Sequence, residues 1–204
     1  MEVYDNEEQQ IEAIKHWWSE NGKTVIIGLV IGLGGIFGWR YYQDSQLEAR
    51  ADASNAYTQV MENLSTKGAE AATQTQDFIN TYESTNYAVL ASMQLAKAHV
   101  DAGELDKALT QLNWGLEHTK DEALTSLLNL RIARVLSAQQ NFDQAITQLD
   151  AIKDEAWQGR VLELKGDILL QKGDQDGARE AYTQAQQASV QNQAIGIKLD
   201  DLAQ

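Results

Sequence analysis

Cysteine and proline are absent from this chain of 204 residues, and basic side chains are few, with 16 Lys and Arg against 30 Asp and Glu. Without cysteine, the chain has no disulfide framework, no thiolate metal site and no cysteine nucleophile. Without proline, no residue of this type breaks a long helical pattern. The formal net charge of −14 argues against nucleic acid as a partner, because phosphate binding requires clustered Lys and Arg.

Side chains suited to catalysis or to metal binding are also scarce. The three histidines, His16, His99 and His118, are scattered, and none stands in a metal-ligand spacing such as HExxH. His99 falls at a core-packing position, where we expect a hydrogen-bonded interior histidine. The remaining composition, dominated by Ala, Gln, Leu, Glu and Asp, is typical of an all-α protein. We therefore predict a helical protein that is not an enzyme and binds no metal or cofactor.

One long apolar stretch stands out near the start of the chain. No charge occurs from Thr24 to Trp39, a length of about 24 Å in a helix, against about 30 Å for the hydrocarbon core of a bilayer. Extending the segment from Lys23 to Tyr42 brings it to roughly 30 Å, because Lys and Arg side chains reach up to the headgroups. Trp and Tyr flank both ends, as in the aromatic belts of membrane proteins. The sequence predicts one transmembrane helix over residues 23–42.

Two other interpretations of this stretch fail. A cleaved export signal requires small residues just beyond the apolar run, but the first candidate, Ala49-Arg50-Ala51, lies about ten residues too late. Residues 1–23 also carry six acids and only two lysines, where an export signal is basic. A dinucleotide site would begin like Gly32-Leu33-Gly34, but Phe37 replaces the third glycine and no strand precedes it.

Glycines lie on one face of the predicted membrane helix, at Gly28, Gly32 and Gly35. Small residues at this spacing allow a second transmembrane helix to approach closely. Glycine is also simply common in membrane helices, so two interpretations stay open: a contact face for a partner helix, or ordinary composition.

The orientation of the membrane helix is not decided by charge. Lys15 and Lys23 precede it, and Arg40 and Arg50 follow it closely, which is a tie under the positive-inside rule. An uncleaved leading segment before a large domain is the usual signal-anchor layout and favours a cytoplasmic N-terminus. Residues 1–22 themselves are typical of a short amphipathic helix that stops at Asn21-Gly22. This segment is either an interfacial anchor or a plain start of the membrane helix.

The chain repeats itself after the apolar stretch. The segments LAKAHVDAGELDKALTQL, IARVLSAQQNFDQAITQL and KGDILLQKGDQDGAREAY begin at residues 95, 132 and 165, so the offsets are 37 and 33 residues. These offsets are close to the period of about 34 residues of the tetratricopeptide repeat, which consists of two antiparallel helices. Each repeat has one matched small residue in its first helix, one in its second helix, and a large residue four positions after the latter. In the three repeats these are Ala96, Ala133 and Gly166; Ala108, Ala145 and Ala178; and Leu112, Leu149 and Tyr182.

We therefore predict an α-solenoid of helix pairs behind the membrane helix. Residues 43–84 form a helical stem with a degenerate leading repeat, residues 85–192 hold three repeats, and residues 193–204 form a capping helix. Such a cap closes the last open face of a solenoid. The same short apolar helix is also suited to docking on another protein.

The first helices of the repeats are expected to line the concave side of the solenoid. Only two of the candidate groove residues are basic, so we expect the groove to accept an apolar or mixed segment rather than an acidic tail. Some of these side chains alternatively pack on the leading helices. The candidates are Leu90, Met93, Lys97, Leu127, Leu130 and Arg134.

The segments EEQQIEAIKHWWSENGK and GLVIGLGGIFGWRYY resemble the YfgM-like family, the ancillary subunits of the bacterial Sec translocon. The resemblance continues more loosely through LRIARV, DQAITQLDAIK and KGDILLQKGDQDGAREAY. It implies a single-pass inner-membrane protein with a cytoplasmic N-terminus and a periplasmic repeat domain. It further implies association with the Sec translocon channel and with a membrane-anchored parvulin-like folding factor, and help for unfolded exported proteins on their way to chaperones. The alternative is an envelope scaffold that holds other membrane proteins without binding unfolded chains.

Overall fold

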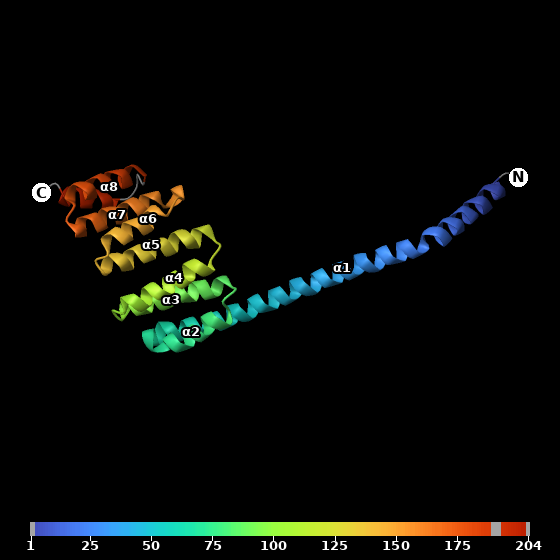
Figure 1. Ribbon diagram of the computed structural model, residues 1–204, viewed down its shortest axis with the longest axis horizontal. Helices are drawn as coiled ribbons and strands as arrows, with labels where there is room; N and C mark the ends of the chain where they lie inside the picture. The colour runs from blue at the N-terminus through green and yellow to red at the C-terminus, as the bar shows by residue number, and fades with distance from the viewer. Residues whose placement is uncertain (1–2, 189–192, 203–204) are drawn as a thin grey trace. The chain divides into compact units, whose positions relative to one another are not determined.

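The computed structural model describes residues 3–188 and 193–202, which form helices and turns and contain no strand (Figure 1). The all-α prediction is confirmed. By contacts the chain divides into two units, Met1–Asp52 and Ala53–Gln204. In chain order the elements are α1 (Val3–Lys67), the 3₁₀ turn η1 (Gly68–Ala71), α2 (Ala72–Thr81), α3 (Asn86–Asp101), α4 (Leu105–His118), α5 (Glu122–Ala138), α6 (Phe142–Asp150), η2 (Glu155–Trp157), α7 (Gln158–Lys172), α8 (Gln175–Ala188) and α9 (Gln193–Asp201).

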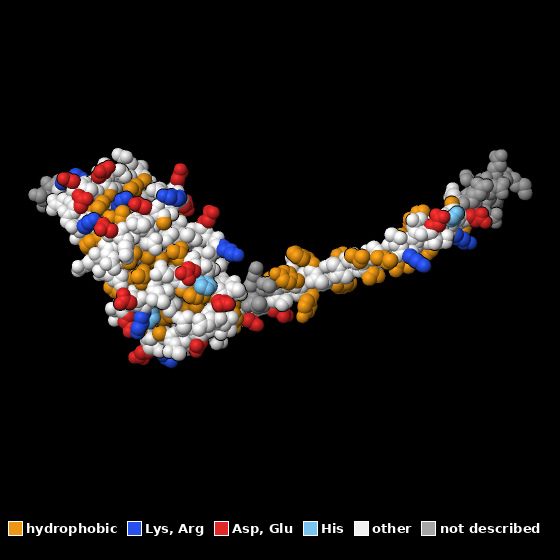
Figure 2. Space-filling view, viewed as in Figure 1, with side chains coloured by type: hydrophobic (Ala, Val, Ile, Leu, Met, Phe, Trp, Pro, Cys, Tyr) orange, Lys and Arg blue, Asp and Glu red, His pale blue; other side chains and the backbone are white. Residues whose placement is uncertain are grey.

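The first unit is made by the N-terminal part of α1. Within Gln10–Ser45, an apolar window of 18 residues has a mean hydropathy of 1.6 and is only 6% buried, so this helix is long and apolar enough to cross a membrane. Figure 2 shows its hydrophobic side chains as one stretch with charged side chains on either side. The structure thus contains one helix of the kind that the sequence predicts.

The expected helix stop at Asn21-Gly22 is wrong, because α1 runs through these residues without a break. The amide nitrogen Nδ2 of Asn21 donates to the Trp17 carbonyl 3.1 Å away, so the side chain bonds inside the helix instead of capping it. Gly22 is buried beside the ring of Trp18. A glycine costs a helix only about 1 kcal/mol relative to alanine, which the surrounding helical sequence overcomes.

The second unit consists of antiparallel helix pairs stacked in chain order (Figure 1). Helix α3 pairs with α4, α5 with α6 and α7 with α8, and these pairs pack on one another in turn. Residues 53–67 of α1 share a buried cluster with α2 and α3. In all three repeats the matched small residue of the first helix, the matched small residue of the second helix and the large residue that follows it are buried. The repeat register predicted from the sequence is therefore confirmed.

The turns inside the three repeats share one geometry. Gly103 and Gly173 end their helices in the left-handed region, with φ of 76° and 92°. Gln140 stands at the matched turn and is the one non-glycine residue in this region among those described, with φ of 64°. In each turn the next backbone N–H bonds back across five residues, as Glu104 N–H does to the His99 carbonyl at 2.8 Å. This pattern is the Schellman motif, which glycine suits best.

The imidazole of His99 reinforces the first of these turns. His99 is 5% exposed, and its Nδ1 lies 2.7 Å from Oε2 of Glu104. The expected interior, hydrogen-bonded histidine is confirmed.

The last helix, α9, covers the end of the α7–α8 pair. Ile195 is fully buried there, with Leu199 and Leu202 packed around the same cluster. The guanidinium of Arg179 on α8 donates to the Leu202 carbonyl at 2.7 Å. A helix that is apolar on one side therefore shields the terminal repeat from water.

Candidate functional site

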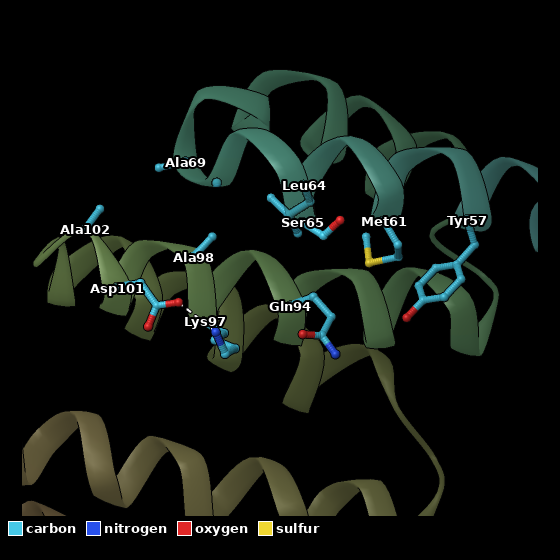
Figure 3. Close-up of a pocket in the computed structure, with 11 residues that line it drawn as sticks. Tyr57, Met61, Leu64, Ser65, Ala69, Gln94, Lys97, Ala98, Asp101 and Ala102 are labelled. Carbon is cyan, nitrogen blue, oxygen red and sulfur yellow. Dashed lines mark hydrogen bonds and ion pairs between the residues drawn. The ribbon is translucent and has the colours of Figure 1, made fainter.

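Three cavities lie along the first helices of the helix pairs. The first has a volume of about 680 Å³ and lies between residues 57–69, around the end of α1, and α3. Figure 3 shows Tyr57, Met61 and Ser65 on one helix turned toward Gln94 and Lys97 on the other. The Tyr57 ring packs against Tyr87 and Phe78, with centroids 5.5 and 6.1 Å away. Apolar and aromatic groups thus dominate the α1 side of this cavity.

The second, central cavity has a volume of about 310 Å³ and lies between α3 and α5, with Leu105 and Leu112 of α4 contributing. Its basic side chains are Lys97, Arg131 and Arg134. The other lining residues are apolar: Met93, Ala96, Val100, Leu105, Leu112, Val135 and Ala138. This cavity therefore joins an apolar wall to a cluster of cations.

The third cavity, of about 340 Å³, lies between α5 and α7, and Leu164, Leu170 and Asp167 help to line it. Neighbouring cavities share side chains: Lys97 lines the first and the second, and Arg134 and Ala138 line the second and the third. The three cavities are consecutive parts of one surface, which we call the groove.

The groove follows a single stripe on each first helix. On α3 the stripe is Gln94, Lys97 and Asp101, which line the first cavity. The matched positions on α5 are Arg131, Arg134 and Ala138 and on α7 are Leu164, Asp167 and Gln171. A spacing of three and then four residues places side chains on one helix face. The groove therefore follows from the repeat: the same face of each first helix lines a cavity, and these cavities adjoin one another.

The six residues chosen from the sequence fall in two groups. Met93, Lys97 and Arg134 line the central cavity. Leu90, Leu127 and Leu130 line none of the three cavities. Met93 and Leu130 are only 2% and 3% exposed and belong to the hydrophobic core, against which the half-buried Leu90 and Leu127 pack. Most of the apolar contact area expected from these leucines is therefore used inside the domain.

Arg131 is the groove residue that the sequence reasoning missed. It stands one turn before Arg134 and matches Gln94 in the preceding repeat, so the repeat register was the signal that could have identified it. Its Nη1 donates to the Met93 carbonyl at 3.4 Å. Burial lowers the pKa of the Arg131 guanidinium, and the neighbouring charge of Arg134 lowers it further.

The acids of the groove already have partners. Asp101 accepts from Nζ of Lys97 at 2.7 Å. Asp167 accepts from Nζ of Lys198 at 2.6 Å and from the hydroxyl of Tyr182 at 2.7 Å. Within residues 3–188 and 193–202, no ion pair involves Arg131 or Arg134. Two arginine charges therefore remain without a carboxylate partner among the described residues, although the chain carries a net charge of −14.

The described residues offer no group of three or more His, Asp or Glu side chains placed to hold a metal ion. On the membrane helix, Gly28, Gly32 and Gly35 face open space, because a Cβ built at any of them meets no atom within 4 Å. The chain itself thus leaves room on this face for another helix.

Comparison with known proteins gives a family for this architecture. The family model described as a tetratricopeptide repeat-like domain matches residues 15–204. The ancillary SecYEG translocon subunit of Escherichia coli (strain K12) is 37% identical over 206 aligned residues that cover 100% of both chains. The protein of the same description from Haemophilus influenzae is 36% identical, over 96% of this chain and 97% of the relative.

Solved structures show the same fold at low sequence identity. PilF of Pseudomonas aeruginosa superposes with a TM-score of 0.60 at 16% identity, over 76% of this chain and 69% of that chain. MamA of Desulfovibrio magneticus RS-1 gives a TM-score of 0.59 at 16% identity, over 74% of this chain and 82% of that chain. At this identity the likeness concerns the fold alone. With a match over its whole length to the Escherichia coli relative, the chain belongs to the family of tetratricopeptide repeat-like proteins described as ancillary SecYEG translocon subunits.

Proposed function

We propose that this protein is a non-enzymatic adaptor of the Sec translocon, anchored in the bacterial inner membrane by the helix at residues 23–42. The observation that carries the proposal is the groove, an open surface of three joined cavities on a repeat domain whose relatives are described as translocon subunits. Helical repeats of this kind create extended concave surfaces that bind other molecules. The groove is therefore the surface through which the adaptor acts.

The N-terminus lies in the cytoplasm and the repeat domain lies in the periplasm. The lysine and arginine count does not choose between the two orientations. A translocon adaptor that meets exported chains must, however, place its binding surface on the side where these chains emerge. A periplasm-specific reporter fused after Gln204 is expected to be active, and a cytoplasm-specific reporter at the same place is expected to be silent. The opposite pattern would remove the adaptor from the exit side of the channel.

The groove holds extended segments of unfolded exported proteins and releases them toward periplasmic chaperones. Apolar side chains along the cavities supply contact area, at about 25 cal/mol for each Å² removed from water. The acids spread over the domain keep it soluble while this apolar surface is open. Besides the channel, the adaptor associates with a membrane-anchored parvulin-like folding factor.

Photocrosslinking in cells tests the role of the groove. A photoreactive residue replaces Gln94 in the first cavity or Gln171 in the third, and Gln184 on the exposed side of α8 serves as the matched control. Chains arrested during export should crosslink from the two groove positions and not from the control. Crosslinks to mature membrane proteins alone would contradict binding of unfolded chains.

A scaffold that holds other membrane proteins without binding unfolded chains is the second candidate. The open face at Gly28, Gly32 and Gly35 suits helix contact within the bilayer, which is all that a scaffold needs. Crosslinks from these positions to the Sec channel are expected under both proposals. Crosslinks from the groove to exported chains are expected only under the first.

A further inference from the structure

We propose that the central cavity recognises an acidic side chain within an extended peptide segment, which Arg131 and Arg134 hold while apolar neighbours of that side chain contact the cavity wall. The inference rests on the proposed function in one respect, that extended segments enter the groove. It adds the chemistry of the preferred segment. It also narrows the expectation from the sequence, an apolar or mixed segment, to a segment with an internal acidic side chain.

Charge complementarity carries the argument. Asp101 and Asp167 also line the groove, but each is held by a lysine, Lys97 and Lys198 respectively. Arg131 and Arg134 have no ion pair with any carboxylate in the described part of the chain. Two guanidinium groups that lie together repel each other, and an incoming carboxylate relieves that repulsion. The cavity thus offers two guanidinium groups without a carboxylate partner among the described residues to an incoming negative charge.

The surroundings of Arg131 strengthen such a contact. Arg131 is half-buried, and its only hydrogen bond in the described structure is the long one, 3.4 Å, from Nη1 to the Met93 carbonyl. Its remaining N–H groups are available to a ligand. A guanidinium presents several N–H groups in a plane, which matches the two oxygens of a carboxylate. Next to an apolar wall, such a pair is screened less by water and salt than a pair on an open surface.

The shape of the groove selects an internal side chain rather than a chain end. Lys97 continues the central cavity into the first cavity, and Arg134 and Ala138 continue it into the third. A bound peptide can therefore extend along the groove on both sides of the two arginines. A site for a terminal carboxylate would end beside the arginines, whereas further cavities adjoin the central one on both sides.

Peptide binding to the full-length protein in lipid nanodiscs tests the proposal. The probes are fluorescent peptides with an acetylated N-terminus and an amidated C-terminus, identical except for a central Glu or Gln between Leu and Val residues. We expect the Glu peptide to bind about tenfold more tightly, the size of effect that a charge-assisted hydrogen bond produces. The preference should diminish as salt is added.

Matched variants assign the preference to the two arginines. In the Arg131→Gln/Arg134→Gln variant, the Glu peptide should bind no more tightly than the Gln peptide. The control Lys67→Gln/Lys120→Gln removes the same charge from exposed positions outside the three cavities and should keep the preference. Thermal unfolding shows whether the double variant folds. If it does not, the single variant Arg134→Gln decides, because Arg134 is exposed and makes no hydrogen bond within the described residues.

The outcomes separate this inference from the proposed function. Equal binding of the Glu and Gln peptides overturns the acidic preference and leaves the groove as a binding surface. Failure of both peptides to bind overturns this inference together with the role of the groove for extended segments. A Gln peptide with a free C-terminal carboxylate that binds as tightly as the blocked Glu peptide overturns recognition of an internal acid in favour of a chain end.

Discussion

Gly166 on α7 lies so close to Tyr182 on α8 that a Cβ at Gly166 would come within 2.5 Å of two carbons of the tyrosine ring. In the other two repeats the matched pairs are alanine and leucine, Ala96 with Leu112 and Ala133 with Leu149. The third repeat therefore combines a smaller residue with a larger one at the same contact. Because the two helices are closely packed, the larger Tyr182 side chain fits only where the facing residue is as small as Gly166.

Gly166→Ala should lower the free energy of unfolding by about 1 to 3 kcal/mol, because the added methyl group overpacks the contact with the buried Tyr182 ring. Adding Tyr182→Leu, which copies the other repeats, should remove the clash and recover part of the loss. Recovery should be incomplete, since the tyrosine hydroxyl also donates to Asp167 at 2.7 Å. Urea unfolding followed by circular dichroism measures both effects. An additive double variant would show that the two residues do not compete for space.

Ala133→Leu tests the same packing in the second repeat. Ala133 is fully buried between its two helices, and we expect a loss of about 1 to 3 kcal/mol in the free energy of unfolding. Ala138 is exposed on the same helix, so Ala138→Leu should leave the melting temperature nearly unchanged. Because Ala138 lines the groove, the same substitution should weaken peptide binding. Equal melting temperatures of the two variants would contradict the repeat register.

The fold was predictable because steric constraints recur in the sequence. The spacing of Ala96, Ala108 and Leu112, repeated twice, reports close helix contacts directly, and the structure buries every member of the pattern. The continuity of α1 through Asn21-Gly22 was not predictable from local signals. Asn and Gly have only a weak local preference for ending a helix, and the helix-forming residues on both sides overcome it.

The groove was only partly predictable, because apolar character was used to choose its residues. Strongly apolar residues on a helix of a solenoid are drawn into the core, as Leu130 is, at 3% exposure. The stripe on α5 that faces the groove starts one residue later, at Arg131. One residue corresponds to a rotation of about 100° around the helix axis, so Arg131 lies on a different face from Leu130. From the sequence of one repeat alone, one cannot tell whether a polar residue such as Arg131 faces a cavity or open solvent.

Gln140→Gly should raise the free energy of unfolding by a few tenths to about 1 kcal/mol. Gln140 holds a left-handed conformation, with φ of 64°, at the turn where the other two repeats have glycine. A side chain costs about 1 kcal/mol or more in this region, and the extra freedom of glycine in the unfolded chain offsets part of the gain. Gly103→Ala is the reciprocal control and should destabilise the protein. A neutral Gly103→Ala variant would show that these turns tolerate a side chain.

The stability that Glu104 contributes should depend on pH. The hydrogen bond from Lys107, at 2.8 Å, and then the one with His99 lower the pKa of the Glu104 carboxyl from its usual value of 4.5. A lowered pKa in the folded state gives stability that is present above pH 4.5 and is lost as the pH falls through the lowered pKa. The difference in unfolding free energy between the wild type and Glu104→Gln should therefore shrink on acidification. In a Lys107→Gln background this pH dependence should be weaker, because the largest cause of the shift is absent.

Gly28→Leu/Gly32→Leu tests whether the glycine face of the membrane helix binds a partner helix. The two leucines keep the segment apolar, and a side chain at either position meets no atom of the protein itself within 4 Å, so membrane insertion should be retained. A partner helix that packs closely on this face would be displaced by the larger side chains. Co-purification of the Sec channel with the variant should therefore fall, whereas Ile27→Leu/Ile31→Leu, at exposed positions of the same helix, should leave it unchanged. Undiminished co-purification of the glycine variant would assign the association to the repeat domain instead.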